Sequence, residues 1–227
     1  MTVRFAVPAD ARVFLGRLTR LDPAAMVRLR PASPVLAGRT ALWARLPWGV
    51  LVTREVAAAA PGDVVVSAAE LLAAGDAGGA EPPLPARRDR EWRWSLPPDS
   101  GELLEEIPAR RLAEVAAAAA GTLREVARTG LAGRPVGSRM LREALLDHVA
   151  IVVEPGAGRA GPVEVPQRLV QGVVRMGFLG RVTDATSRVR IRRAGRWVAL
   201  AARYGTGWLP PPAGPLTVRP TGLPGRE

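Results

Sequence analysis

Residues 165–180 read VPQRLVQGVVRMGFLG, and residues 188–203 read RVRIRRAGRWVALAAR. The first stretch has apolar residues at helical spacing and ends in glycine, the residue type that often follows a helix C-terminus. It therefore predicts a helix over 166–179. The second stretch alternates arginine with apolar residues on both sides of an Ala-Gly pair, which predicts a two-stranded hairpin.

Polar side chains of this region fall on single faces of the predicted helix and hairpin. The seven residues concerned are Arg168, Gln171, Arg175, Arg188, Arg190, Arg192 and Arg193. Arginine and glutamine on such faces can bind phosphates and base edges. The pattern predicts a nucleic-acid-binding surface, although an amphipathic helix and a hairpin with solvated outer faces would carry the same pattern.

The C-terminal half has the predicted order helix 108–128, helix 138–148, a β-rich segment, helix 166–179 and the hairpin. This order resembles a winged-helix domain in outline, although no diagnostic motif carries the likeness. The resemblance implies a mainly helical domain over 91–205 whose helix enters the DNA major groove while its ribbon contacts the backbone. It departs from the usual pattern because residues 149–165 separate the two helices that would form the helix–turn–helix.

The N-terminal half predicts a different unit. Residues 1–74 contain a helix that begins near Pro8 and alternating segments over 25–56, which predict an antiparallel meander. Residues 75–90 have the Gly, Pro and charge content of a linker, or of a long surface loop within a single fold, and residues 206–227 that of a tail. The expected fold class is α+β, with this small helix-and-sheet unit followed by a mainly helical, winged-helix-like domain that ends in a β-hairpin.

The composition favours anionic partners. All 32 basic residues are arginine, and the chain has no lysine, asparagine or cysteine, which is typical of GC-rich, actinobacterial genomes. Codon bias therefore explains part of the arginine excess, but it does not set the number of acids. Residues 1–54 carry nine arginines against two acids, 55–130 carry eight against thirteen, and 131–227 carry fifteen against six. Basic ends around an acidic middle attract nucleic acid, anionic lipid or an acidic protein.

Several chemistries are excluded or disfavoured. The absence of cysteine excludes disulfides and thiolate catalysis, and His148 is the single histidine. The sequence Gly156-Ala-Gly158-Arg-Ala-Gly161 matches a dinucleotide-binding spacing, but the prolines that follow favour a loop between two strands. We therefore expect a non-enzymatic protein without a cofactor. No apolar run approaches the roughly 18 residues of a membrane span, and the N-terminus has no signal-like segment, so we expect a cytoplasmic protein.

Two functional hypotheses follow from the sequence. The first is a nucleic-acid-binding protein that uses the predicted helix and ribbon, with a regulatory role as one option. The alternative is a protein-interaction or scaffold module whose basic ends dock an acidic partner or its own acidic middle, or that self-associates. Trp92, Trp94 and the segment Pro210–Pro212 would then be natural contact surfaces.

Overall fold

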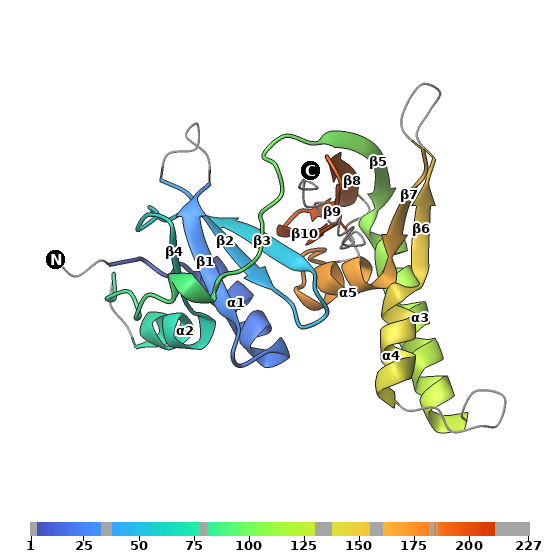
Figure 1. Cartoon of the computed structure of the whole chain (residues 1–227), viewed down its shortest axis with the longest axis horizontal. Coiled ribbons are helices and arrows are strands. Elements are labelled where there is room, and N and C mark those ends of the chain that lie inside the picture. Colours follow the sequence, from blue (N-terminus) through green and yellow to red (C-terminus); the bar gives the residue numbers. More distant parts are fainter. Residues whose placement is uncertain are drawn as a thin grey trace, which may run out of the picture.

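A computed structural model describes residues 4–32, 38–77, 81–129, 138–154, 161–181, 184 and 186–211 (Figure 1). The helices in these ranges are α1 (Ala9–Leu21), α2 (Ala68–Asp76), α3 (Ala109–Thr129), α4 (Ser138–Asp147) and α5 (Gln167–Arg175), with a 3-10 turn η1 (Asp89–Glu91). The strands are β1 (Met26–Pro31), β2 (Thr40–Arg45), β3 (Leu51–Val56), β4 (Val64–Ser67), β5 (Glu102–Pro108), β6 (Val149–Val153), β7 (Val163–Pro166), β8 (Arg188–Ala194), β9 (Trp197–Ala202) and β10 (Gly205–Leu209).

Eight of the strands form one antiparallel sheet in the order β4-β1-β2-β3-β10-β9-β8-β5. Strands from the two halves of the chain meet where β3 pairs with β10, with Thr53 opposite Thr206. The sheet is therefore continuous across the chain. Strands β6 and β7 form a separate two-stranded ribbon.

A helix layer covers one face of this sheet and supplies the core (Figure 1). Alternate strand residues such as Val27 and Leu29 are fully buried and pack in one apolar cluster with Leu169 and Val173 of α5. The rings of Phe14 in α1 and Phe178 after α5 stack with their centroids 6.3 Å apart. This stacking ties the helix of the N-terminal half to the segment that follows α5.

Three strands run directly into helices, with no loop between them: β4 into α2, β5 into α3, and β7 into α5. Ser67 caps α2 by accepting a hydrogen bond from the Glu70 amide. Pro108 and Pro166 stand at the other two junctions. Proline has no amide hydrogen to leave unpaired at a helix start, so it suits these positions.

The predicted winged-helix-like domain is wrong. Its hairpin, β8 and β9, lies in the interior of the large sheet, because β5 pairs with β8 on one side and β10 pairs with β9 on the other. Both flanking strands fall in segments for which the sequence predicts no strand. β5 precedes the predicted helix 108–128, and β10 overlaps the predicted tail 206–227. The C-terminal half thus contributes four strands to a sheet rather than a mainly helical domain with a free wing.

Smaller differences concern α5 and the tryptophan segment. Helix α5 ends at Arg175 instead of reaching 179, and a turn with glycines at positive φ continues to Gly180. Residues 92–97, which include Trp92 and Trp94, form an irregular segment after η1. The predicted linker 75–90 and the domain division based on it stay predictions. No helix among the described residues combines the length and the apolar character needed to cross a membrane.

Replacing Gly207 with alanine should destabilise the protein. A Cβ on Gly207 would lie 2.8 Å from Val173 and 3.1 Å from Leu169, so α5 could not keep its distance from β10. Overpacking of this kind costs about 1–3 kcal/mol of unfolding free energy. The matched control is Gly121→Ala in α3, where a Cβ meets nothing within 4 Å, and which should be neutral or stabilising. Urea unfolding measures both, and equal stability of Gly207→Ala and the unmodified protein would contradict the close approach.

Candidate functional site

A hollow of about 970 Å³ lies between α4, α5, the end of α1 and the turn that joins β2 to β3. We call it the arginine pocket. Five arginines from four elements and two acidic residues are among those that line it: Arg20, Arg45, Arg142, Arg168, Arg175, Glu143 and Asp147. The lining thus brings together residues from both halves of the chain.

Trp48 forms one wall of the arginine pocket and fixes α5 in place. Its indole N–H donates to the Arg168 carbonyl at 3.0 Å, and the Arg168 guanidinium donates back to the Trp48 carbonyl at 3.0 Å. The Arg175 guanidinium lies over the Trp48 ring, 5.4 Å from its centroid. The turn around Trp48 is possible because Gly49 adopts a positive φ of 88°. This wall is therefore formed before any ligand arrives.

The charges of the arginine pocket are not balanced. Arg168 forms an ion pair with Asp147. In the part of the chain that the structure describes, the pocket's other four arginines form no ion pair with a carboxylate. Arg20 donates to the Gly16 carbonyl of its own helix, and Arg142 is exposed. Positive charge therefore remains available to an anionic group that enters the pocket.

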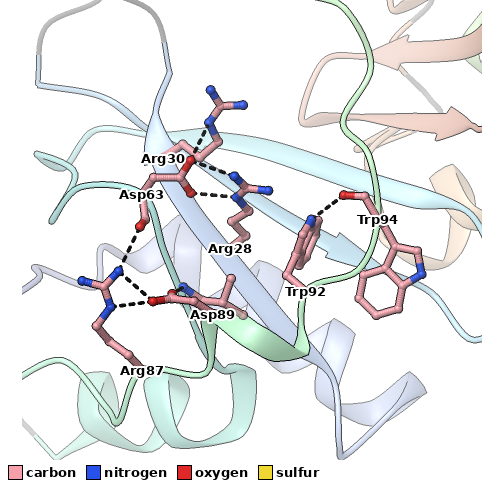
Figure 2. A network of polar contacts seen from close by, with 8 residues as sticks. Arg28, Arg30, Asp63, Arg87, Asp89, Trp92 and Trp94 are labelled. Atoms are coloured by element: carbon pink, nitrogen blue, oxygen red, sulfur yellow. Dashed lines mark hydrogen bonds and ion pairs between the residues drawn. The ribbon is translucent and has the colours of Figure 1, made fainter.

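Arg45 connects the pocket to a segment that crosses the opposite face of β1 and β2. We call residues 87–97 the strap. The Arg45 guanidinium lies 5.2 Å from the centroid of the Trp94 ring, and the Arg28 guanidinium lies 5.7 Å from that of Trp92. The two rings meet edge to face at 5.2 Å, and the Trp92 indole donates to the Trp94 carbonyl at 2.7 Å (Figure 2). Each tryptophan ring therefore contacts an arginine of this chain, and both tryptophans are half-buried.

An ion-pair network anchors this region of the sheet (Figure 2). Arg28 donates to both carboxylate oxygens of Asp63, at 2.7 and 2.8 Å, and Arg30 lies 3.4 Å from the same carboxylate. The hydrogen bond from Arg28 lowers the pKa of Asp63 and raises that of Arg28 itself. Both groups therefore stay charged over a wide range of pH.

The start of the strap is joined to β4 by further polar contacts. Asp89 accepts a hydrogen bond from the Val65 amide at 2.8 Å, and the Arg88 amide donates to the Val65 carbonyl at 2.7 Å. Arg87 contacts both the Asp89 carboxylate and the Asp63 carbonyl (Figure 2). The strap thus occupies the outer edge of β4, which would otherwise be the open edge of the sheet.

The structure divides the residues predicted to bind nucleic acid. Arg168 and Arg175 line the arginine pocket, as described above. Gln171 lies on a side of α5 that faces α3, where its amide donates to the Ala116 carbonyl at 3.2 Å. Only two of the three predicted helix residues therefore share one site.

The predicted ribbon residues lie on the other face of the sheet or along its edge. Val189 and Ile191 face the core, so their neighbours Arg188 and Arg190 point to the face opposite α5. These two arginines line a separate hollow of about 450 Å³. Three arginines of β8 donate hydrogen bonds to β5 or to the residue before it. Arg190 donates to Glu106 at 2.9 Å, Arg192 to the Gly101 carbonyl at 3.0 Å, and Arg193 to Glu102 at 3.0 Å.

The seven predicted residues consequently do not form one continuous basic surface. The sequence reasoning missed Arg20, Arg45 and Arg142, which the fold brings to the arginine pocket. It also missed the role of Trp48. The tryptophan in the Pro-Trp-Gly turn was the signal that could have revealed it, because the indole N–H of a tryptophan that becomes buried usually finds a hydrogen-bond partner.

Comparison with known proteins places the C-terminal half in a family. A model described as a domain of unknown function, DUF8185, matches residues 96–214, which is more than half of the chain. The chain belongs to the DUF8185 family. A second model, also described as a domain of unknown function (DUF8010), matches residues 3–94. No curated protein matches this DUF8185 member. These findings do not bear on the predicted actinobacterial origin, which stays a prediction.

Solved structures with a similar fold are sliding clamps of bacterial DNA polymerase. The β subunit of Streptococcus pyogenes DNA polymerase has a TM-score of 0.53 at 10% identity, over 91% of this chain and 64% of the clamp. The Bartonella birtlesii clamp bound to griselimycin scores 0.53 at 12% identity, over 92% and 64%. The griselimycin-bound Pseudomonas aeruginosa clamp scores 0.50 at 13% identity, over 96% and 66%. The chain thus spans less than two thirds of each clamp, and the likeness shows the fold.

These comparisons correct the first functional hypothesis. The prediction of a winged-helix regulator is wrong, because the solved structures of similar fold are sliding clamps and the hairpin is paired on both sides within a large sheet. Among the described residues there is no group of three His, Cys, Asp or Glu side chains that could hold a metal ion. What the structure offers is a preformed, positively charged pocket.

Replacing Asp63 with asparagine should lower the free energy of unfolding by an amount that depends on pH. The pKa of Asp63 is lowered on folding from about 3.9, so its carboxylate contributes stability above that pH. The contribution is lost as the pH falls through the folded-state pKa. Because the side chain is 42% exposed, solvent screens the pair, and we expect a loss of only about 0.5–1 kcal/mol near neutral pH.

Urea unfolding across a pH series tests this expectation. The difference in stability between Asp63→Asn and the unmodified protein should narrow as the pH falls below about 4. Asp99→Asn is the control, because Asp99 is exposed and forms no ion pair with any described residue. A difference that does not change with pH, or one shared by Asp99→Asn, would contradict the assigned role of the ion pair.

Proposed function

We propose that this chain is a non-enzymatic interaction module with a clamp-like fold, which docks an acidic segment of a partner protein in the arginine pocket. One observation carries the proposal. Five arginines from α1, β2, α4 and α5 line a single hollow, and of these only Arg168 forms an ion pair with a carboxylate among the described residues.

The chemistry of the pocket suits carboxylates. A guanidinium presents several N–H donors in a planar fork that matches a carboxylate, and such charge-assisted hydrogen bonds are stronger than neutral ones. Like charges gathered in one hollow repel each other, and an acidic segment relieves that repulsion. Because Trp48 and Arg168 already hold each other, less side-chain freedom is lost on binding.

The internal ion pairs favour a separate partner over a second copy of the chain. The acidic middle of the sequence is largely engaged within the fold: Asp63 pairs with Arg28, Glu102 with Arg193 and Glu106 with Arg190. These carboxylates are therefore not available to the arginine pocket of another copy. We therefore infer that an acidic segment that enters the pocket comes from a different protein.

The similarity of fold supports a role in an assembly rather than in catalysis. The similar solved structures are β subunits, that is, sliding clamps, of DNA polymerase. A protein of this fold can serve as a subunit that presents surfaces to other proteins. At identities of 10–13% the likeness names no partner, so the pocket itself defines the chemistry of the ligand.

Charge reversal at Arg142 should weaken the binding of an acidic peptide. A suitable probe is a fluorescein-labelled peptide of glutamate and serine, titrated at low salt and followed by fluorescence anisotropy. Arg142→Glu should reduce affinity about fivefold to tenfold, because reversing one surface charge changes the interaction by roughly 1 kcal/mol. Arg142 is exposed and has no ion pair with a described residue, so the fold should not depend on it.

The control is Arg196→Glu, which makes the same charge change at the exposed turn between β8 and β9. It should lower affinity only slightly, through the change in net charge. If both variants weaken binding equally, the peptide responds to the overall charge of +11 and not to the pocket. That result, or no binding by the unmodified protein, would overturn the proposal.

A further inference from the structure

A second hollow, which we call the apolar groove, lies beside the N-terminal part of α1, whereas the arginine pocket lies at the C-terminal end of the same helix. Its volume is about 720 Å³, and it is formed by α1, the start of α3, the turn after α5 and the turn between β9 and β10. Apolar side chains make up much of its lining: Val13, Ala113, Val174, Leu179 and the ring of Tyr204. It is therefore different in chemistry from the arginine pocket.

Two of these large apolar side chains are exposed to solvent. Val13 is 52% exposed and Tyr204 is 38% exposed. Among the described residues only Leu103 and Val152 are also large, hydrophobic and exposed. Half of this small set thus lines one groove, and apolar side chains gathered at a hollow are typical of a contact surface.

The walls of the groove are held in position by the fold. The Tyr204 ring lies against Gly180, where a Cβ would come within 2.4 Å of it. The Arg54 guanidinium lies 5.7 Å from the centroid of the same ring and 3.5 Å from Asp10. Arg17 lies against Gly177, whose missing side chain leaves space for the guanidinium.

Arginines surround the apolar lining. Arg17, Arg54 and Arg181 line the groove, and Asp10 is the acidic residue beside them. Asp10 pairs with Arg54. Within the ranges that the structure describes, Arg17 and Arg181 form no ion pair with a carboxylate. The rim is thus positively charged, and it complements an acidic ligand that also carries an apolar group.

The groove and the arginine pocket open along one side of α1. Val13, Arg17 and Arg20 recur at i, i+4 and i+7, so they share one face of the helix. Val13 and Arg17 line the groove, and Arg20 lines the pocket. Arg17 and Arg20 are only about 4.5 Å apart along the helix axis. On α5, Val174 lines the groove and the next residue, Arg175, lines the pocket.

We propose that the apolar groove binds an aliphatic or aromatic anchor residue of the same partner segment that places its carboxylates in the arginine pocket. The partner is then a linear acidic peptide with an apolar anchor, lying along the outward side of α1. This inference rests on the proposed function, because it describes the partner of that site. The exposed valine and tyrosine select the anchor, and the arginines of both hollows select the acidic residues around it.

Two fluorescein-labelled peptides of equal length and equal Asp and Glu content test the inference. One has a central Leu-Phe pair, and the other has Ser-Ser in its place. The anchored peptide should bind at least about tenfold more tightly to the unmodified protein, which corresponds to burying one apolar side chain. Its advantage should persist as salt is raised, because salt screens the charges and leaves apolar burial largely unchanged.

Val13→Glu should remove the advantage of the anchored peptide, because it places a charge at the exposed wall of the groove. The matched control is Val152→Glu, at a similarly exposed valine of β6, which should retain the advantage. Tyr204→Ser alters the opposite wall and should act like Val13→Glu. Thermal unfolding of each variant tests whether the fold is kept, and we expect a cooperative transition for all three.

The outcomes separate the two proposals. If both peptides bind equally to the unmodified protein, or if Val13→Glu and Tyr204→Ser both keep the preference for the anchored peptide, the inference about the groove is overturned. The proposed function would then still stand on the effect of Arg142→Glu. If neither peptide binds, the proposed function is overturned and the inference with it.

Discussion

The pairing of β3 with β10 is the contact on which the rest of the molecule depends. Only three residue pairs form it, and they join the two halves of the chain into one sheet. Gly207 of β10 leaves the space that Val173 and Leu169 of α5 fill. With α5 at this distance, its first turn reaches Trp48 in the turn before β3. The arginine pocket therefore depends on the pairing of β3 with β10, because its lining residues come from both halves of the chain.

Local pattern predicts the strands and helices that bury an alternating or periodic apolar face. α1, β1 to β3, β8 and β9 occupy segments with such a pattern. β5 does not, because its sequence ELLEEIP places charges where alternation would require apolar residues, and Arg190 and Arg193 of β8 pair with them. β10 does not either, because its glycines are explained by neighbours distant in the sequence: Phe178 and the Thr53 carbonyl at Gly205, and the side chains of α5 at Gly207. A hairpin pattern also shows which residues face the core without showing what pairs with its edges, and this is why the winged-helix expectation failed.

The candidate site could be predicted only in part, because local spacing shows which residues share a face of one element but not which elements meet. Helical spacing places Arg168 and Arg175 on one face of α5, and they do share a pocket. The spacing does not show that Arg20, Arg45 and Arg142 join them from three other elements. The uneven distribution of charge along the chain is reflected in its ion pairs. Acids of the middle segment pair with arginines of both ends, as Asp63 does with Arg28 and Glu106 with Arg190. Within the described ranges, arginines without a carboxylate partner remain at the arginine pocket and at the apolar groove.

The combination of these two hollows matters energetically. Each exposed ion pair contributes at most about 1 kcal/mol and is weakened by salt. A purely acidic ligand would therefore bind weakly at physiological ionic strength, and its electrostatic attraction would mainly speed association and exclude basic ligands. Apolar burial adds an attraction that salt does not screen. Because α1 presents Val13 and Arg20 on one face, a single peptide can use both contributions at once. Affinity would then come from the anchor, and the choice of acidic partners from the arginines.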